Sequence, residues 1–215
     1  MEIDTPFETE IEVTALLHKC PGLQFIAFDD LSLEESPNGY KVATIQEVEG
    51  HFFFKATGRR PKDVFIKEVV TLHNISHPNI VALKACVINE DKKVVGFLTE
   101  YAENGDLHDH YHSPTNLKQA WILQLVDALS YLQKEGIEYH DIKPRNLVIV
   151  DGKLKMIDFD GGYSRGYYKK GFDCFPLAII LEDLGFPGAE SLVEEAKSKQ
   201  ISFDTFRSRF ISLTC

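Results

Sequence analysis

Residues 138–149 read EYHDIKPRNLVI, and they bring three side chains able to do chemistry into six positions. Asp141 could accept or orient the proton of a hydroxyl, and Lys143 could neutralise charge on a phosphoryl group in transit. Asn146 adds a carboxamide, and Pro144 stiffens the turn between these groups. Transfer of a phosphoryl group depends mainly on positioning and electrostatic stabilisation, and these residue types supply both.

The residues after this loop predict a tight β-hairpin. Two short strands, 147–150 and 153–157, are separated by an Asp-Gly pair, which favours a two-residue turn. We expect the hairpin to place Asp158 beside Asn146, since antiparallel partners lie about 5 Å apart. An aspartate and an asparagine that converge offer hard oxygen ligands of the kind that Mg²⁺ prefers. A polar loop that only caps a hairpin would explain any one of these residues, but not their joint spacing.

The segments DIKPRN, which begins at Asp141, and MIDF, which contains Asp158, resemble two motifs of the eukaryotic protein kinase superfamily. These are its catalytic loop and its metal-binding motif. The resemblance implies that Asp141 is the catalytic base and that Lys143 stabilises the transferred charge. It also implies that Asn146 and Asp158 hold Mg²⁺ and that ATP supplies the γ-phosphoryl group. The expected reaction is that of a Ser/Thr protein kinase, with a hydroxyl as the acceptor.

Further landmarks of the superfamily occur in the family's order along the chain. FFFKA contains Lys55, which resembles the lysine that holds the α- and β-phosphates, and Glu68 resembles the glutamate that pairs with it. HPNIVAL resembles the turn after the helix that carries this glutamate, and FLTEYAENGDL resembles the hinge between the lobes. The resemblance implies that the backbone at Glu100 and Ala102 binds adenine and that Asp106 reaches the ribose.

The implied fold is α+β, with the two lobes of a protein kinase-like domain. Residues 1–101 are expected to form a small, β-rich N-terminal lobe with one regulatory helix. Residues 102–215 are expected to form a shortened, mostly helical C-terminal lobe. Residues 189–215 either dock on this second lobe or mediate association.

Hydrophobic periodicity gives the predicted elements of each lobe. In the first lobe the predicted elements are strands at 22–28, 40–48, 51–56, 80–88 and 94–101, and a helix that follows Pro61 and ends near Ser76. In the second lobe a long helix is expected from an N-cap at Thr115 to Gly136, followed after the hairpin by helices at 172–184, 189–199 and 203–211. The apolar face predicted for the long helix consists of Leu117, Trp121, Leu125, Ala128, Leu129 and Leu132.

The chain also departs from the superfamily pattern. No G-x-G-x-x-G precedes Lys55, so backbone amides would be poorly placed around the phosphates and nucleotide affinity would be low. The H-R-D triplet reads Y-H-D, and the missing arginine argues against control by an activation-loop phosphate. D-F-G reads D-F-D. No A-P-E follows, and Asp173, the candidate for the aspartate of the next family helix, comes only 15 positions after Asp158.

These features leave three interpretations of the function. An active, compact kinase explains why the lysines, acids and asparagine of the implied site are all present. A pseudokinase that acts as a binding or regulatory module explains the missing glycine loop and the missing A-P-E segment. A small-molecule kinase similar to aminoglycoside and choline kinases explains the short segment after Asp158, although HPNIV and the hinge resemble protein kinases. We favour the first interpretation, with ATP and Mg²⁺ as cofactors and an unidentified protein or small hydroxyl compound as substrate.

The charge balance argues against a nucleic-acid partner. The formal net charge is −10 and the sequence pI is about 5.3, whereas nucleic-acid binding needs a clustered basic face. The basic runs, Arg59-Arg60 with Lys62 and Lys169-Lys170, are short, and we interpret them as solvated loops.

The remaining composition predicts a soluble, cytoplasmic protein without a membrane segment. The N-terminal MEIDTPFETE is acidic and lacks the apolar core of a signal peptide, and the apolar stretch 175–181 is too short to span a bilayer. Four cysteines are widely spaced without a metal-binding pattern, and Cys86 and Cys174 are expected to pack as small hydrophobic thiols. The sequence carries no signal for oligomeric state.

Overall fold

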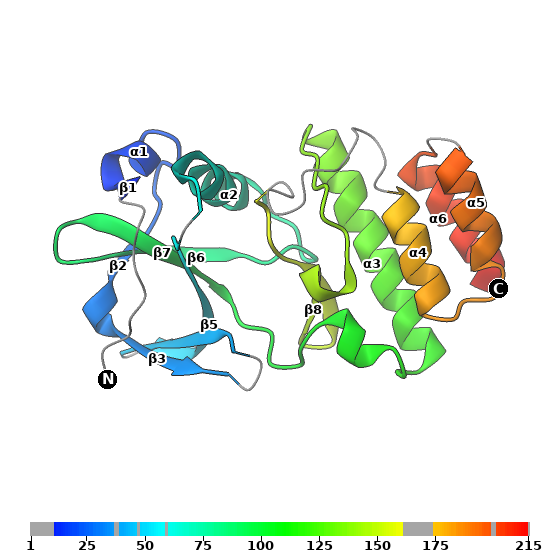
Figure 1. Cartoon of the computed structure of the whole chain (residues 1–215), viewed down its shortest axis with the longest axis horizontal. Helices are drawn as coiled ribbons and strands as arrows, with labels where there is room; N and C mark the ends of the chain where they lie inside the picture. The colour runs from blue at the N-terminus through cyan, green and yellow to red at the C-terminus, as the bar shows by residue number, and fades with distance from the viewer. Residues whose placement is uncertain are drawn as a thin grey trace. The chain divides into compact units, whose positions relative to one another are not determined.

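The computed structural model describes residues 11–36, 39–46, 48–58, 60–160, 174–198 and 201–214, and the chain divides into two compact units (Figure 1). The first unit comprises Met1–Ser76 and Val81–Tyr101, and the second comprises His77–Ile80 and Ala102–Cys215. The first is built on a β-sheet and the second mainly on helices, which confirms the predicted α+β class. The assignment of residues 1–101 and 102–215 as the two lobes of one domain stays a prediction.

The sheet of the first unit has seven strands in the order β2-β6-β7-β5-β4-β3, with β1 paired to β7. Strand β2 runs parallel to β6, and the other pairs are antiparallel. Buried side chains from several strands form a hydrophobic cluster: Ala43, Phe54, Val87, Val95 and Leu98. The strands are β1 (Ile11–Glu12), β2 (Phe25–Ala27), β3 (Leu31–Glu35), β4 (Lys41–Ile45), β5 (Val48–Ala56), β6 (Leu83–Ile88) and β7 (Lys93–Glu100).

The strand predictions for this unit are confirmed in part. The strand expected over 40–48 is two strands, because the chain turns at Gln46 between β4 and β5. The strand expected over 22–28 is shorter, since a 3₁₀ turn, η1 (Phe28–Asp30), follows β2. Strand β3 has no predicted counterpart, because its leucines alternate with polar residues and are only partly buried. Weak alternation of this kind is a poor strand signal.

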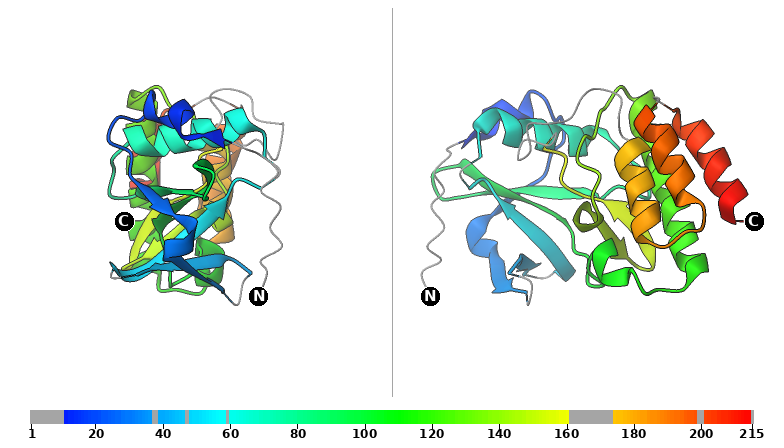
Figure 2. Two further views of the ribbon diagram at one scale, coloured as in Figure 1. Left: turned by 90° about the vertical axis from the view of Figure 1, so that its left-hand side faces the viewer. Right: turned by 45° about the vertical axis from the view of Figure 1, so that its right-hand side comes forward.

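Two helices, α1 (Val13–Leu17) and α2 (Lys62–Asn74), lie on the same side of this sheet (Figure 1 and Figure 2). Helix α2 confirms the predicted helix, because the apolar side chains of Phe65, Val69 and Leu72 recur at a helical period and are all buried. It ends at Asn74, ahead of the His77-Pro78 pair, where the residue before proline resists the helical conformation.

The free thiols of the described residues, Cys20, Cys86 and Cys174, are all buried, which confirms the predicted packing of Cys86 and Cys174. Burial raises the pKa of Cys86 to about 12, with the nearby Cys20 as a smaller cause. Below pH 9 both the folded and the unfolded chain keep this thiol protonated. Above pH 9 only the unfolded chain ionises it, so stability is lost as the pH rises toward 12.

We therefore expect Cys86 to contribute to alkaline unfolding. The loss of unfolding free energy that Cys86 causes should grow by about 1.4 kcal/mol for each pH unit above 9, up to the folded-state pKa. Urea unfolding at pH 8, 9, 10 and 10.5 should give a steeper loss of unfolding free energy for the unmodified chain than for Cys86→Ala. Parallel pH profiles for the two proteins would contradict this assignment, because every other titrating group is common to both.

Helix α3 (Thr115–Lys134) is the longest element of the second unit. The predicted face from Trp121 to Leu132 is buried, but Leu117 is 43% exposed, so the apolar stripe begins one turn later than predicted. The predicted N-cap at Thr115 is wrong, because Pro114 occupies the N-cap position and Thr115 is the first helical residue. The helix ends before Gly136, whose φ of 69° places it in the left-handed region that favours glycine.

A two-stranded hairpin follows, made of β8 (Leu147–Val150) and β9 (Lys153–Met156), as predicted. Its register pairs Leu147 with Met156 and Val150 with Lys153 across the turn. Two 3₁₀ turns, η2 (Leu107–His110) and η3 (Pro144–Asn146), precede these strands along the chain.

Three helices complete the second unit: α4 (Cys174–Asp183), α5 (Ala189–Ser198) and α6 (Phe203–Thr214). They confirm the predicted helices within the described residues. Helix α6 contacts α3, where Gln119 Nε2 donates a 2.8 Å hydrogen bond to Thr214 Oγ1 and Arg207 pairs with Asp127. The described part of residues 189–215 therefore docks on its own unit, beside the other helices (Figure 1). In the described part of the chain, no helix is both long and apolar enough to cross a membrane.

Candidate functional site

The residues of the predicted site fall in both units, and each unit brings part of the set together. Lys55, Glu68 and Glu100 lie in the first unit. The residues in the second unit are Ala102, Asp106, Asp141, Lys143, Asn146 and Asp158.

Asp141 is the centre of a buried polar cluster in the second unit. Its side chain is 1% exposed, and its Oδ2 accepts hydrogen bonds from Lys143 Nζ at 2.5 Å and from Asn146 Nδ2 at 2.7 Å. Asn146 Nδ2 also donates to the backbone carbonyl of Asp141 at 3.0 Å. Since Lys143 is charged, its bond to the carboxylate is of the stronger, charge-assisted kind. The cluster therefore fixes both the position and the orientation of the carboxylate.

Pro144 explains how six consecutive residues can bring these groups together. It is the first residue of η3, where its fixed φ suits the start of a turn. The turn closes when the Asn146 backbone N–H donates to the Lys143 carbonyl at 2.9 Å. The chain then enters β8 directly, so the loop is anchored at its C-terminal end by the hairpin.

The other carboxylate oxygen of Asp141, Oδ1, is buried and accepts no hydrogen bond from any residue that the structure describes. Leaving a buried polar atom unsatisfied costs about 1–3 kcal/mol, and more for a charged group. A hydroxyl group donated by a bound molecule would remove this cost. The carboxylate therefore has one oxygen held by two donors and one oxygen without a described donor.

Tyr139 ties the loop to the end of the hairpin. Its hydroxyl donates to the carbonyl of Ile157, and its ring lies 5.1 Å from the ring of Phe159, centroid to centroid. Burial, followed by the carboxylates of Asp158 and Asp141, raises the pKa of Tyr139 well above its usual value. This phenol therefore stays protonated and keeps donating its hydrogen bond. Sequence reasoning missed this role, although a tyrosine in place of the family's histidine marked the position.

The backbone is strained on both sides of this link. His140 has φ 63° and Asp158 has φ 64°, values in the left-handed region that side chains other than glycine rarely adopt. Each such residue costs on the order of 1 kcal/mol and persists where the surroundings over-determine it. These two lie immediately before Asp141 and at the predicted metal ligand. Strain of this kind clusters at functional sites.

The hairpin register brings Asn146 and Asp158 to the same end of the strands. The Ile157 N–H donates to the Asn146 carbonyl at 3.0 Å, which extends the β8–β9 pairing by one residue on each side. The two hydrogen bonds from the Asn146 side chain to Asp141 both leave from Nδ2 and do not use its Oδ1 oxygen. This donor set suits Mg²⁺, which takes oxygen ligands. The metal-binding role of the two residues stays a prediction.

The D-F-D motif ends in a buried acid. Asp160 is 6% exposed, and Phe159 before it is also buried. A glycine at the position of Asp160, as in the family pattern, would carry no charge there. The short segment that separates Asp158 from Asp173 lies outside the described residues from residue 161 onward.

Lys55 and Glu68 form an ion pair in the first unit. Lys55 Nζ lies 2.5 Å from Glu68 Oε1, and the two side chains are 12% and 1% exposed. Lys55 is carried by β5 and Glu68 by the buried face of α2, so the pair links the sheet to the helix. The Lys55 ammonium also lies 5.8 Å from the centre of the Phe97 ring, a cation–π distance.

Arg60 is a second cation at this carboxylate. Its guanidinium NH1 lies 3.6 Å from Glu68 Oε2, and its side chain is 33% exposed. Arg60 therefore contacts a buried carboxylate, a contact that the interpretation as a solvated loop did not include. No periodic or motif signal in the sequence predicted this contact.

Two of the three residues implied as nucleotide contacts have other side-chain roles in the described structure. Glu100 ends β7, and its side chain accepts from the Ala82 N–H at 3.2 Å. Asp106 caps η2 by accepting from the His108 N–H at 2.9 Å. Neither role involves the Glu100 or Ala102 backbone groups that the resemblance assigns to adenine. The predicted nucleotide contacts of Glu100, Ala102 and Asp106 stay predictions.

The turn between β3 and β4 uses several of its own amides. The Ser36 N–H donates to the Tyr40 carbonyl at 2.8 Å and the Gly39 N–H to the Ser36 carbonyl at 2.8 Å. The Tyr40 N–H donates to Ser36 Oγ at 3.0 Å. These three amides are therefore engaged within the turn and do not form an open cradle for an anion.

The class of protein that these features define is that of the protein kinases. A family model described as a protein kinase domain matches residues 51–179, more than half of the chain. This range contains the buried Lys55–Glu68 pair and the whole Asp141 cluster. The chain belongs to the protein kinase family.

The chain is similar to several Ser/Thr kinases over about half of its length. It is 32% identical over 114 residues to serine/threonine-protein kinase stk11 of Xenopus laevis, a match that covers 50% of this chain and 26% of that protein. It is 32% identical over 111 residues to NUAK family SNF1-like kinase 2 of Rattus norvegicus, covering 49% and 17%. It is 32% identical over 98 residues to an Aurora kinase of Schizosaccharomyces pombe, covering 43% and 27%. The matches thus span about a quarter or less of these curated relatives.

Proposed function

We propose that this protein transfers the γ-phosphoryl group of Mg-ATP to a hydroxyl, as a Ser/Thr protein kinase does. The observation that carries the proposal is the buried carboxylate of Asp141, which has one oxygen held by two donors and the other without a described donor. A carboxylate that only stabilised the fold would be expected to have both oxygens satisfied.

In this proposal the catalytic residues act as follows. Asp141 Oδ1 accepts the hydroxyl proton, and Lys143 holds the carboxylate and stabilises negative charge on the transferred group. Bound Mg²⁺ would neutralise charge on the phosphates. The residues assigned to ATP and metal are Lys55 and Glu68 for the phosphates, Glu100 and Ala102 for adenine, Asp106 for ribose, and Asn146 and Asp158 for Mg²⁺.

The hydrogen bonds within the turn between β3 and β4 predict that this protein binds nucleotide weakly. An open glycine loop would offer its amides to the phosphates, whereas three amides of this turn are already bonded within it. The affinity for ATP should therefore depend mainly on Lys55, the metal and the hinge. We expect saturation at millimolar rather than micromolar nucleotide.

A thermal shift with ATP and Mg²⁺ tests the proposal. At about 10 times Kd, which 10 mM nucleotide reaches when Kd is about 1 mM, a ligand adds roughly 1.4 kcal/mol of stability, which corresponds to about 3–6 °C for a chain of this size. The shift should need both ATP and Mg²⁺, and it should fall in Asp158→Asn, which removes a charged metal ligand. Asp151→Asn, an exposed aspartate in the hairpin turn, is the matched control. No shift at 10 mM Mg-ATP would overturn the proposal.

A pseudokinase that binds a partner without transferring phosphate is the second candidate. The observations that favour it are the self-bonded turn between β3 and β4 and the acid at Asp160. In this case nucleotide would bind weakly or not at all, and no acceptor would be phosphorylated. Transfer from ATP to a serine or threonine peptide would exclude it.

A further inference from the structure

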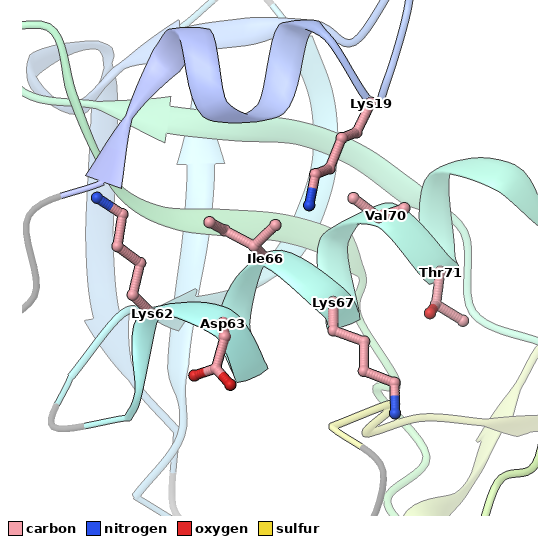
Figure 3. Close-up of a pocket in the computed structure, with 7 residues that line it drawn as sticks. All are labelled: Lys19, Lys62, Asp63, Ile66, Lys67, Val70 and Thr71. Carbon is pink, nitrogen blue, oxygen red and sulfur yellow. The ribbon is translucent and has the colours of Figure 1, made fainter.

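A pocket of about 560 Å³ lies in the first unit between α1 and α2 (Figure 3). Its apolar floor is formed by Ile66 and Val70, which are half-buried side chains of α2. Lys62 and Ile66 are separated by four residues, as are Ile66 and Val70, so the three side chains follow one stripe of the helix. Figure 3 shows this stripe directed toward α1, with Lys19 extending over it from the other side. The pocket is not part of the kinase site.

The pocket carries an excess of positive charge. Lys19, Lys62 and Lys67 line it, against the single carboxylate of Asp63. None of these lysines forms a salt bridge with any carboxylate in the described part of the chain. The nearby acid Glu12 is already paired with Lys93. This is unexpected in a protein with 33 acidic and 23 basic residues, where exposed cations have many acidic neighbours.

The arrangement of charge around an apolar floor fits one kind of ligand. The stripe from Lys62 to Val70 is about 12 Å long at 1.5 Å per residue. An extended peptide covers this length with about four residues at 3.3 Å each. Figure 3 shows the Lys62 and Lys19 side chains on either side of Ile66. A matching peptide would place an apolar side chain on Ile66 and Val70 and carboxylates near the two ammonium groups.

We propose that this pocket binds an acidic peptide segment of a partner protein. The segment has an apolar residue with an acid two or three positions away on each side. A free phosphate would leave the apolar floor uncovered. A nucleic acid would need a longer run of cations than these three lysines provide. The proposal goes beyond the kinase function and does not depend on it.

The test is binding of labelled peptides to the full chain. A library of eight-residue peptides with the core Asp-x-Leu-x-Asp, fluorescein-labelled and measured by fluorescence anisotropy, should contain members that bind. Replacing both aspartates of a binder with asparagine should weaken it about tenfold, the effect of losing two exposed ion pairs, and raised salt should do the same. If no library member binds at millimolar protein, or the asparagine peptide binds equally well, the proposal is wrong.

Variants of the chain locate the site. Lys19→Glu with Lys62→Glu should weaken the peptide at least tenfold, whereas Lys153→Glu with Lys197→Glu, which changes the net charge equally, should leave it unchanged. The methyl resonances of Ile66 should shift on titration with the peptide and not with inorganic phosphate. An equal loss of peptide affinity in both double variants would show that binding depends on net charge. That result would overturn the proposal that the pocket is the binding site. Displacement of the peptide by a single-stranded RNA or by anionic vesicles, but not by unlabelled peptide, would also overturn it.

Discussion

Replacing Asp141 with asparagine should lower the rate of phosphoryl transfer by a factor of about 10²–10⁴, the usual contribution of a general base. Asparagine keeps an oxygen in the position of Oδ2, so it can still accept from Lys143 and Asn146. It cannot take a proton at the other atom. We therefore expect kcat to fall while the thermal shift with Mg-ATP is kept. The measurement is ADP release with a library of serine and threonine peptides as acceptors.

Asp151→Asn is the matched control for this experiment, because it makes the same chemical change at an exposed residue of the hairpin turn. Its rate should equal that of the unmodified chain. If Asp141→Asn keeps full activity while Asp151→Asn is also active, the assignment of the base is wrong. If transfer occurs only to aminoglycosides or choline and never to peptides, the acceptor class of the proposed function is wrong while the base assignment stands.

The sequence predicts the Asp141 cluster well because the interactions within it are local. Lys143 and Asn146 are within five residues of Asp141, and Pro144 limits the conformations of the segment between them. The hairpin after it is also predicted, since an Asp-Gly turn between two apolar runs specifies a register over a few residues. Local geometry of this kind needs no knowledge of the rest of the fold.

The features that the sequence does not predict depend on contacts between distant segments. Arg60 lies 3.6 Å from Glu68, and nothing in its sequence spacing marks this contact. Leu117 continues the apolar period of α3, but it lies in the first turn of the helix, where its side chain is exposed. The buried face begins at Trp121. Periodicity predicts which side of a helix is apolar, and tertiary packing decides how far that side is buried.

Replacing Glu68 should have a large effect on the stability of the first unit. Breaking a buried ion pair by removing one partner typically costs 3–5 kcal/mol, because the remaining charge stays buried without compensation. Glu68 is 1% exposed and Lys55 12% exposed, so water can replace little of what the carboxylate supplies. We expect Glu68→Ala to lower the unfolding free energy by about 3 kcal/mol or more, measured by urea unfolding. Glu68→Gln, which keeps the shape of the side chain, should cost less because it can still accept from Lys55.

Arg60→Gln separates the contributions of the two cations at this carboxylate. Arg60 is 33% exposed and lies 3.6 Å from Glu68, so its loss should cost less than about 1 kcal/mol. Lys55→Met should remove the shorter of these two contacts, and the double variant Lys55→Met with Glu68→Gln should be more stable than the sum of the single losses predicts. Additive losses would show that the pair does not act as a unit. Because β5 carries Lys55 and α2 carries Glu68, a strongly non-additive result would mean that one interaction sets both the packing of the helix on the sheet and the position of the lysine assigned to the phosphates.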